Sequence, residues 1–414
     1  MSAAQVLSEQ EQASANAVRL LYVCDFPPSH AAGGSILLAR LLESYPADSL
    51  MVLTGSHASR VSTTEGRLAC PQITFPTSRG WGRWGLGRIR VALDWLRLPL
   101  LTLLCMRLIR RHSSQVVMTL LHGRFYFAAC AAARLTGTPY VLFVHDYYLD
   151  DKDSMFASLL RFGTGMVTRH AARLYAVSAG MQQKLKNEFG VDSELQLPAT
   201  RAAVIAPSEV VKVRNEQFRI LYAGAITTAV EDSLDMLIRI VADGGLKESG
   251  INSAMLQLFS VIKPNQLRRR NWDDPNVQVS SWIPQGEIPQ TLSRADMLFL
   301  PFSFREEERG TTETAFPSKT ADYLASGRPI LVFGPKYSTL VRYARQEGFA
   351  EIVDEFDAAA LLNGIQNIAL SQSRQHELAS RSLETFAKNH DIERQRREFQ
   401  SSLRALSRLK TSHR

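Results

Sequence analysis

The chain has 414 residues, of which 45% are hydrophobic and 21% charged; these are the proportions of a globular protein rather than of a disordered or fibrous one. The four cysteines, Cys24, Cys70, Cys105 and Cys130, form no CxxC pair, so neither a zinc site nor a disulfide framework is expected and a reducing compartment is favoured. The 48 basic and 40 acidic residues leave a net charge of +8, which favours an anionic partner such as a phosphate ester, nucleic acid or an acidic membrane face.

Short apolar runs alternate with helical patterns along the first half of the chain. Residues 1–17 are polar and contain no apolar signal core, so we expect a disordered tail there. The runs that follow predict strands at 18–26, 48–55, 114–121, 139–146 and 173–178, and helices at 33–45, 123–137 and about 155–172. Continuous apolar strands that alternate with helices are typical of a parallel, doubly wound sheet.

A second series of the same kind follows a pause at 197–218, which has two prolines and mixed charge and is interpreted as an interdomain connection. Strands are predicted at 219–225, 254–261, 277–283, 296–302 and 328–334, and helices at about 233–243, 290–295, 318–326, 338–348, 357–369 and 372–409, with a loop at 303–315. The sequence therefore predicts an α/β protein with two doubly wound Rossmann-like domains that face a cleft, at 18–200 and 201–390. A C-terminal helix at 391–414 is expected to pack back on the N-terminal domain.

The segment 79–111 has an unusual composition, with eight arginines, one acid and three tryptophans. Its longest uncharged run, 98–106, is much shorter than the roughly 20 apolar residues that a membrane-spanning helix needs. A basic amphipathic segment with tryptophans is the expected form of a membrane-surface contact. The alternative is a helix that is buried on one side and keeps its arginines in water.

Several loops after predicted strands carry candidate binding residues. Gly33 and Gly34 open a helix, Gly224 follows the first strand of the second series, and His145 ends an apolar strand; Ile283, beside Trp282, offers an apolar edge to a planar base. Each also has an ordinary structural explanation. The absence of GxGxxG, HExxH, GxSxG and P-loop patterns argues against dinucleotide-binding, metalloprotease, serine hydrolase and NTPase functions.

The stretch "FPSKTADYLASGRPI" at 316–330 predicts a helix that starts near Ser318 and ends at Gly327. Lys319 adds a full positive charge at the helix start, where a phosphate can bind. Asp322 lies about one turn further on, where its carboxylate can accept hydrogen bonds from ribose hydroxyls. The alternative is a surface pair of opposite charges worth a few tenths of a kcal/mol.

Taken in order, these pieces resemble the GT-B glycosyltransferases, in particular the retaining family four. The matching segments include "LLYVCDFPPSHAAGGS", "VLFVHD", "ILYAGAI" and "SSWIPQGEIPQTLSRADMLFLPF", and the most specific is "FPSKTADYLASGRPILVFG". The resemblance covers roughly residues 18–400. It implies transfer of a sugar from a nucleotide-diphosphate donor held by the C-terminal domain to an acceptor held by the N-terminal domain.

The resemblance also assigns site residues, and the chain departs from the family pattern at several of them. Asp322 stands at the ribose-binding acid in place of the family's glutamate, Thr314 stands where the family has its first glutamate, and the usual Arg and Lys after Gly224 are missing. We expect Lys319, helped by Arg305 or Arg309, to supply the lost charge. The expected catalytic residues are His145, Lys319 and Asp322.

The resemblance predicts donor contacts from Gly33, Gly34, Gly224, Ile283, Thr314, Ser318, Lys319 and Asp322. The lone Asp-x-Asp triplet, at 151–153, is far in sequence from this site, so we expect no metal ion and no cofactor beyond the donor.

The predicted function is a retaining hexosyltransferase-like enzyme of cell-surface polysaccharide or glycolipid synthesis, with a glycan or lipid-linked acceptor. We expect a cytoplasmic protein, bound peripherally to the inner face of the plasma membrane through 79–111, with no nucleic-acid partner. A non-catalytic nucleotide-binding or scaffolding subunit is the alternative, because the acid pair is altered. A nucleotide-sugar epimerase is a third option.

Overall fold

The computed structural model describes residues 17–29, 33–56, 68–77, 93–146, 157–202, 217–248, 250–260 and 272–411. Most of the predicted tail, residues 79–92 of the basic segment, the Asp-x-Asp triplet and most of the interdomain connection lie outside these ranges. The chain divides into two units, Met1–Gln196 with Ile392–Arg414, and Leu197–Asp391. The domain boundaries predicted from sequence are 200/201 and 390/391. The cleft predicted between the two domains stays a prediction.

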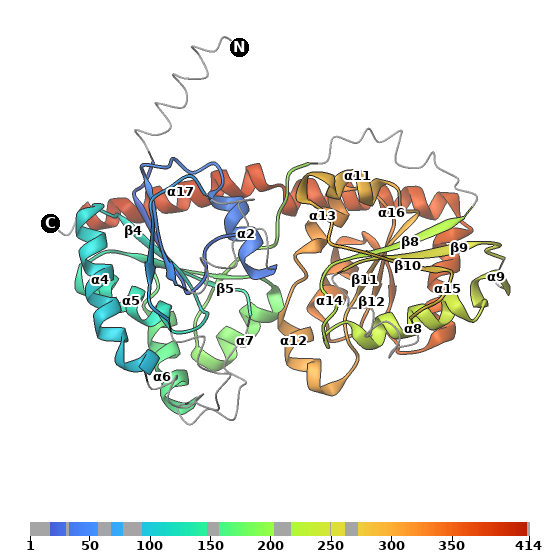
Figure 1. Cartoon of the computed structure of the whole chain (residues 1–414), viewed down its shortest axis with the longest axis horizontal. Helices are drawn as coiled ribbons and strands as arrows, with labels where there is room; N and C mark the ends of the chain where they lie inside the picture. The colour runs from blue at the N-terminus through green and yellow to red at the C-terminus, as the bar shows by residue number, and fades with distance from the viewer. Residues whose placement is uncertain are drawn as a thin grey trace, which may run out of the picture. The chain divides into compact units, whose positions relative to one another are not determined.

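The first unit is a seven-stranded parallel sheet with the strand order β3-β2-β1-β4-β5-β6-β7 (Figure 1). Its strands are β1 (Leu20–Val23), β2 (Leu50–Gly55), β3 (Gln72–Phe75), β4 (Val116–Leu120), β5 (Tyr140–Val144), β6 (Arg173–Ala176) and β7 (Glu194–Leu195). Its helices are α2 (Gly33–Leu42), α4 (Leu98–Arg111), α5 (Phe125–Leu135), α6 (Ala157–Arg169), α7 (Ala179–Phe189) and α17 (Ile392–Thr411).

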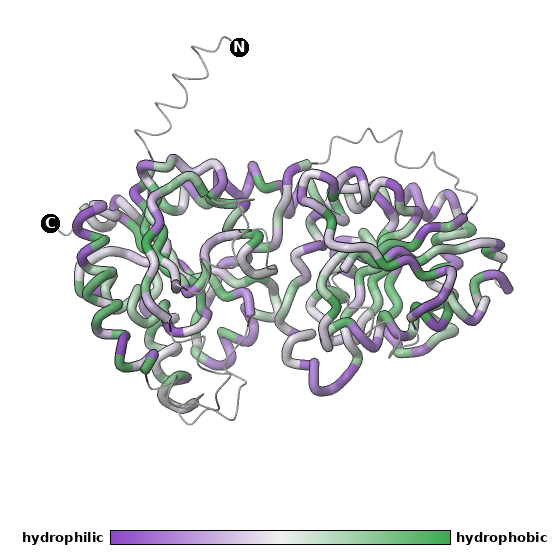
Figure 2. Tube along the Cα trace, viewed as in Figure 1, coloured by the Kyte–Doolittle hydropathy of each residue, from purple (hydrophilic) through white to green (hydrophobic). Residues whose placement is uncertain are grey.

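The central strands β1, β4 and β5 are buried along their whole length, which explains why their sequences are continuously apolar rather than alternating. One core cluster packs Leu21, Val23 and Val117 of the sheet against Cys105 of α4 and Ala129 of α5. The apolar strands are seen in green at the centre of each unit in Figure 2, with hydrophilic segments around them.

The second unit is a six-stranded parallel sheet with the order β10-β9-β8-β11-β12-β13. Its strands are β8 (Phe218–Ala223), β9 (Ala254–Phe259), β10 (Val277–Ser280), β11 (Met297–Pro301), β12 (Ile330–Phe333) and β13 (Ala350–Val353). Its α-helices are α8 (Glu231–Ala242), α9 (Gly245–Glu248), α11 (Ile288–Ser293), α12 (Arg309–Thr314), α13 (Lys319–Ala325), α14 (Thr339–Glu347), α15 (Ala358–Ala369) and α16 (Gln372–Thr385). Short 3-10 turns lie at η3 (Gln285–Glu287) and η4 (Glu306–Glu308), and a π-helical turn at η5 (Phe386–His390).

These two sheets confirm the predicted α/β fold, including the return of the C-terminal helix to the first unit. Arg396 of α17 donates through Nε to the carbonyl oxygen of Arg40 in α2 at 2.8 Å and pairs with Glu43 at 2.9 Å. The Tyr175 hydroxyl bonds the hydroxyl of Ser402 at 2.9 Å. The terminal helix thus belongs to the first unit although 195 residues of the second unit precede it.

Two local predictions are wrong. The helix predicted at 372–409 is broken, because Asp391 is extended and pairs with Thr200 as the chain leaves the second unit. The loop predicted at 303–315 contains η4 and α12, where Arg309 bonds Glu313 one turn away and Thr312 is buried. The edge strands β3, β7 and β13 were not predicted; each has two to four residues and is at most partly buried, so its apolar signal is weak.

Candidate functional site

Each sheet has a point where the chain leaves neighbouring strands in opposite directions, and α/β proteins bind ligands outside the carboxyl ends of the strands at such points. In the second unit this point lies between β8 and β11. Gly224 directly follows β8, and α13 follows β11 in sequence. The residues predicted to hold the donor diphosphate therefore come from the two elements that flank this point.

Lys319, the first residue of α13, places its ammonium at the end of β8. Its Nζ lies 3.8 Å from the ring centre of Tyr222, the last residue but one of the strand. Gly224 has φ +151°, and a Cβ there would lie only 2.3 Å from Nζ and 2.7 Å from Cε of Lys319. A residue without a side chain is thus required at 224 for the lysine to reach this position.

A hydrogen bond fastens α13 to the same strand. The Tyr323 hydroxyl, fully buried, accepts from the backbone N–H of Ala223 at 2.8 Å. The Tyr222 hydroxyl in turn donates to the carbonyl oxygen of Ala225 at 2.7 Å. Helix and strand therefore fix the position of Lys319 from two sides.

Burial lowers the pKa of Lys319 from its usual 10.5 to about 7. An anion beside Nζ would stabilise the charged form and raise this pKa again, because opposite charges favour ionisation. A lysine poised in this way is a strong candidate for binding a diphosphate.

The other residues predicted in the second unit lie on elements near this edge of the sheet. Asp322 is half-buried in the first turn of α13, and Ser318 is its N-cap without a side-chain cap bond. Ile283 is buried just after β10, beside Trp282, which is 47% exposed. Thr314 is buried at the end of α12, and its hydroxyl donates to the carbonyl oxygen of Gly310 at 2.7 Å. The ligand roles of these residues stay predictions.

The expected anion site at the helix after Gly224 has acidic side chains of its own. The first turn of α8 carries Glu231 and Asp232, and Asp232 already accepts the backbone N–H of Phe304 at 2.9 Å. Arg305 lies 3.5 Å from Glu231, and Arg309 bonds Glu313 at 2.9 Å. Because both arginines face acids, Lys319 is the better candidate for the diphosphate.

The residues predicted in the first unit lie at two places in its fold. Gly33 and Gly34 are the first two residues of α2. His145 directly follows β5 and is half-buried, with its ring 6.0 Å from that of Phe143. His145 thus stands at the carboxyl edge of the sheet, as the sequence predicts; its role toward a sugar stays a prediction.

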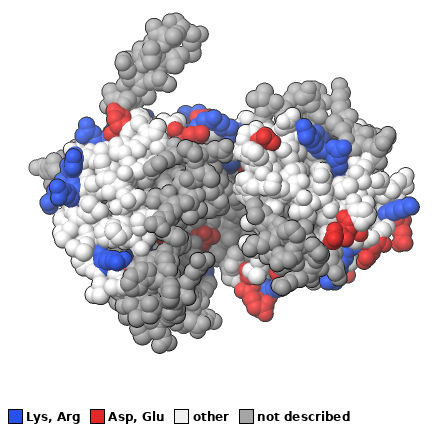
Figure 3. Space-filling view, viewed as in Figure 1, with Lys and Arg blue, Asp and Glu red and all other residues white. Residues whose placement is uncertain are grey.

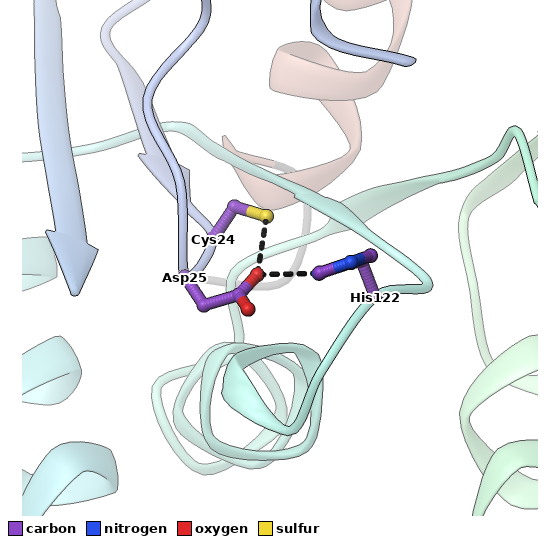
Figure 4. Close-up of side chains that lie close together, drawn as sticks. All are labelled: Cys24, Asp25 and His122. Carbon is purple, nitrogen blue, oxygen red and sulfur yellow. Dashed lines mark hydrogen bonds and ion pairs between the residues drawn. The ribbon is translucent and has the colours of Figure 1, made fainter. Parts of the chain in front are cut away.

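A pair that was not predicted lies at the same edge, between β1 and β4. The Nδ1 of His122 is 2.6 Å from Oδ1 of Asp25, and the thiol of Cys24 is 3.4 Å from the same oxygen (Figure 4). The side chains of His122 and Asp25 are 19% and 15% exposed. The two residues are 97 apart in sequence, and the available signal was that each follows a strongly apolar strand.

Cys24, Asp25 and His122 are also the described residues that are close enough together to hold a metal ion. Burial raises the pKa of the Cys24 thiol well above its usual value, and the negative charge of Asp25 raises it further. Metals bind the thiolate rather than the thiol, so this cluster is a poor metal site in its present form. The expectation that the protein needs no metal stays a prediction.

The described part of the basic segment forms α4 and a short helical stretch at 93–96 before it. One face of α4 is buried through Leu101, Cys105, Leu108 and Ile109, whereas Leu96, Leu100 and Leu103 are 61–73% exposed. A largely apolar pocket of about 610 Å³ lies beside it, lined among others by Trp95, Leu98, Phe127 and Met166. Arg110 and Arg111 are exposed in the last turn of the helix.

The face of the first unit seen in Figure 3 is largely uncharged outside its grey regions, with Lys and Arg groups at its outer edge. No helix among the described residues is long and apolar enough to span a bilayer.

Comparison with known proteins supports the assignment of the fold. Residues 38–207 match the family model described as glycosyl transferase 4-like domain. No curated protein matches the chain.

Three solved structures with low sequence identity share its fold. HepE of Anabaena, solved in complex with UDP, has a TM-score of 0.65 and 13% identity over 94% of this chain and 100% of its own. A glycosyltransferase from Rickettsia africae has a TM-score of 0.66 and 13% identity over 94% and 99%. Sucrose-phosphate synthase from Thermosynechococcus elongatus has a TM-score of 0.64 and 14% identity over 94% and 98%. These structures confirm the GT-B fold that the resemblance implies, and the family model supports the glycosyltransferase resemblance over residues 38–207.

Proposed function

We propose that this chain, with its GT-B fold and glycosyl transferase 4-like domain, transfers a sugar from a nucleoside-diphosphate donor to the hydroxyl group of an acceptor. The observation that carries the proposal is the position of Lys319, 3.8 Å from the Tyr222 ring and against Gly224, at the switch point of the second sheet. A buried ammonium with a lowered pKa gains most when it meets a diphosphate. The UDP complex of HepE makes uridine diphosphate the first donor nucleotide to test.

In this proposal the parts of the donor are held by different elements of the second unit. Lys319 binds the diphosphate and stabilises the charge that develops as the sugar leaves. Asp322, one turn further along α13, accepts hydrogen bonds from the ribose, and the base packs beside Ile283. For His145, which lies in the first unit, the resemblance implies a contact with the transferred sugar. The resemblance also implies that the anomeric configuration of the sugar is retained and that no metal ion is needed. The anomeric configuration of the product, determined by NMR, tests the retention.

The donor assignment is tested with two ligands that differ in the ribose. We expect UDP to bind in titration calorimetry and to raise the melting temperature, and inorganic pyrophosphate to bind more weakly. Asp322→Asn should weaken UDP binding and leave pyrophosphate binding unchanged, whereas Lys319→Met should weaken both.

The remaining outcomes separate the alternatives. Failure of UDP, ADP and GDP to bind, and of their sugar conjugates to be hydrolysed, would refute the enzyme proposal. Binding without hydrolysis or transfer would support the non-catalytic nucleotide-binding subunit. Conversion of a donor to its epimer would support the epimerase.

For the acceptor we propose a lipid-linked glycan or glycolipid at the inner face of the plasma membrane, within cell-surface polysaccharide or glycolipid synthesis. The exposed leucines of α4, its arginines and the adjacent apolar pocket support this choice. Apolar side chains beside basic ones are what an interfacial helix presents to an anionic bilayer.

The membrane contact is tested by sedimentation with vesicles in which phosphatidylglycerol is mixed with phosphatidylcholine. We expect wild type to bind, and Leu100→Glu with Leu103→Glu to lower the bound fraction about tenfold or more. Leu370→Glu is the matched control, because Leu370 is equally exposed at 60% but lies in the second unit. Equal binding by wild type and the double variant would favour a helix that simply keeps its arginines in water.

A further inference from the structure

The second unit carries a groove between α8 and α15, on the face of its sheet opposite α13. Helix α8 joins β8 to β9 and α13 joins β11 to β12, so the two helices lead in opposite directions along the sheet. Right-handed crossovers therefore place them on opposite faces, and Figure 1 shows them on either side of the strands. Helix α15 packs beside α8. The two helices and the loops after β11 and β13 border a groove of about 790 Å³.

The sequence of α8 explains why this helix has a second face of mixed character. Leu237 and Ile238 are buried in the core of the unit. The residues of α8 that line the groove follow one flank of the helix: Asp232, Asp235, Met236, Arg239, Ile240 and Asp243. The facing flank of α15 contributes only small or apolar residues, Ala358, Ala359 and Leu362. The groove therefore has one charged wall and one apolar wall.

Three phenylalanines form an apolar surface at one end of the groove. The ring centre of Phe304 lies 4.8 Å from that of Phe333 and 5.1 Å from that of Phe356. Phe333 is fully buried in β12, whereas Phe356, which lines the groove, is 49% exposed. A ring that packs on its neighbours and is still half exposed offers a fixed surface to a flat apolar group of a ligand.

A buried carboxylate lies beside this aromatic surface. Asp232 is 7% exposed, and its Oδ2 accepts the backbone N–H of Phe304 at 2.9 Å. Its Oδ1 is also buried and has no hydrogen-bond partner among the residues that the structure describes. A buried carboxylate oxygen without a partner costs free energy, so a ligand gains affinity by donating a hydrogen bond to it. Asp235, one turn further along α8, is half-buried and accepts the indole N–H of Trp272 at 2.7 Å.

The charges of the groove indicate that its ligand is neutral. Three acids and two arginines line it, so an ion of either sign would meet charges of its own sign. A carboxylate only accepts hydrogen bonds and a guanidinium only donates them, whereas a hydroxyl group does both. A ligand with many hydroxyl groups and apolar C–H faces therefore fits the acids, the arginines and the phenyl rings together.

We propose that the groove between α8 and α15 binds a neutral oligosaccharide. The C–H face of one sugar ring packs on Phe356, and a hydroxyl group donates to Oδ1 of Asp232. Between Asp232 and Asp243 the groove follows α8 for about 16 Å, at about 1.5 Å per residue, which is longer than a single sugar ring. This site is additional to the sugar-transfer site of the proposed function and uses neither Lys319 nor Asp322.

The test uses the full chain labelled with ¹³C at the methyl groups of its methionines. Met236 lines the groove, Met236→Leu identifies its NMR signal, and Met166 in the first unit is the internal reference. We expect at least one of three neutral hexasaccharides, maltohexaose, cellohexaose and N-acetylchitohexaose, to shift the Met236 signal with a dissociation constant in the millimolar range or below. The Met166 signal should stay where it is.

Two substitutions test the two proposed contacts. Asp232→Asn keeps an oxygen for the N–H of Phe304 but puts an amide donor where Oδ1 was, so the dissociation constant should rise about tenfold or more. Phe356→Ala should raise it about threefold to tenfold, and because the ring is half exposed this variant decides the question even if Asp232→Asn does not fold. Phe162→Ala is the matched control: Phe162 is 64% exposed but lies in the first unit, so glycan binding should be unchanged.

Three outcomes would overturn the proposal. The first is that none of the three neutral hexasaccharides shifts the Met236 signal, and the second is that both substituted proteins bind the glycan as tightly as wild type. The third is binding of the cationic glucosamine hexamer alone, which would mean that the acids hold an organic cation. None of these measurements requires a nucleotide. A protein that binds a neutral glycan in this groove but no nucleoside diphosphate would support the groove and refute the proposed function.

Discussion

Replacement of Lys319 by methionine should make the protein more stable and at the same time weaken its binding of the nucleotide. Methionine keeps the length and the apolar stem of the side chain but removes the ammonium that lies 3.8 Å from the Tyr222 ring. A residue that lowers stability but is required for binding is expected at a ligand site, where function and stability conflict.

The expected gain follows from two opposing terms. The fall of the lysine pKa from 10.5 to about 7 means that charging the buried amine costs about 5 kcal/mol relative to water, at about 1.4 kcal/mol per pH unit. The cation–π contact with Tyr222 returns up to about 2 kcal/mol of this. At a pH of about 6.5, where the amine is mostly charged, Lys319→Met should stabilise the second unit by about 2–3 kcal/mol, or about 5–10 °C in its melting temperature.

Calorimetric melting and titration with UDP test both halves of this prediction. The variant should bind UDP about 10–100-fold more weakly, because a hydrogen bond to a charged group contributes about 1.5–3 kcal/mol. Lys336→Met is the matched control: Lys336 is exposed, pairs with Glu355 at 3.2 Å, and should change neither quantity. A Lys319→Met protein that melts below wild type, or that binds UDP equally well, would refute the reasoning.

Other predictions concern the same edge and the folding of the second unit. Gly224→Ala should weaken UDP binding about tenfold or more, because its Cβ would lie 2.3 Å from Nζ of Lys319. Gly348→Ala is the control: Gly348 has φ +72° and no atom within 4 Å of its Cβ position, so the variant should lose about 1 kcal/mol of stability and bind UDP as wild type does. Above a pH of about 7 the affinity of wild type for UDP should fall about tenfold per pH unit, because the free amine of Lys319 must take up a proton before it can bind the diphosphate. The same fall in Lys319→Met would contradict this. Burial lowers the pKa of His390 from the usual 6.5 to about 4. As pH falls, His390 therefore takes up its proton in the unfolded chain before it does so in the folded one, and stability is lost between pH 6.5 and about 4. Denaturant unfolding is then measured at about pH 7 and about pH 4.5. The loss of stability at the lower pH should be about 2–2.5 kcal/mol smaller in His390→Gln than in wild type, and parallel losses would count against this assignment.

The sequence predicted the strands and their order of appearance well because both sheets are parallel and covered by helices. Strands such as β4 and β5 are buried on both faces, so their apolar runs are continuous and easily recognised. The short helix α12 was missed because it carries almost no apolar residue; the contact of Arg309 with Glu313 and the buried Thr312 hold it in place. The break at Asp391 depends on where the chain leaves the second unit, which no local pattern records.

The residues of the candidate site differ in how far sequence could identify them. Lys319 and Asp322 lie within one short motif, so their spacing already suggested a ligand. The requirement for glycine at 224 became clear only in three dimensions, since the lysine that approaches it is 95 residues away in sequence. Asp25 and His122 share no motif, and their contact depends on β1 and β4 being neighbours in the sheet.

The two switch points differ in charge, and this difference predicts which of them binds a nucleoside diphosphate. The second unit offers an amine held against an aromatic ring, which suits a diphosphate when it is protonated. The first unit offers an imidazole bonded to a carboxylate, and the negative charge of that carboxylate disfavours an anionic ligand. A substitution at Lys319 should therefore raise the dissociation constant of the nucleotide, whereas His122→Gln should leave it unchanged.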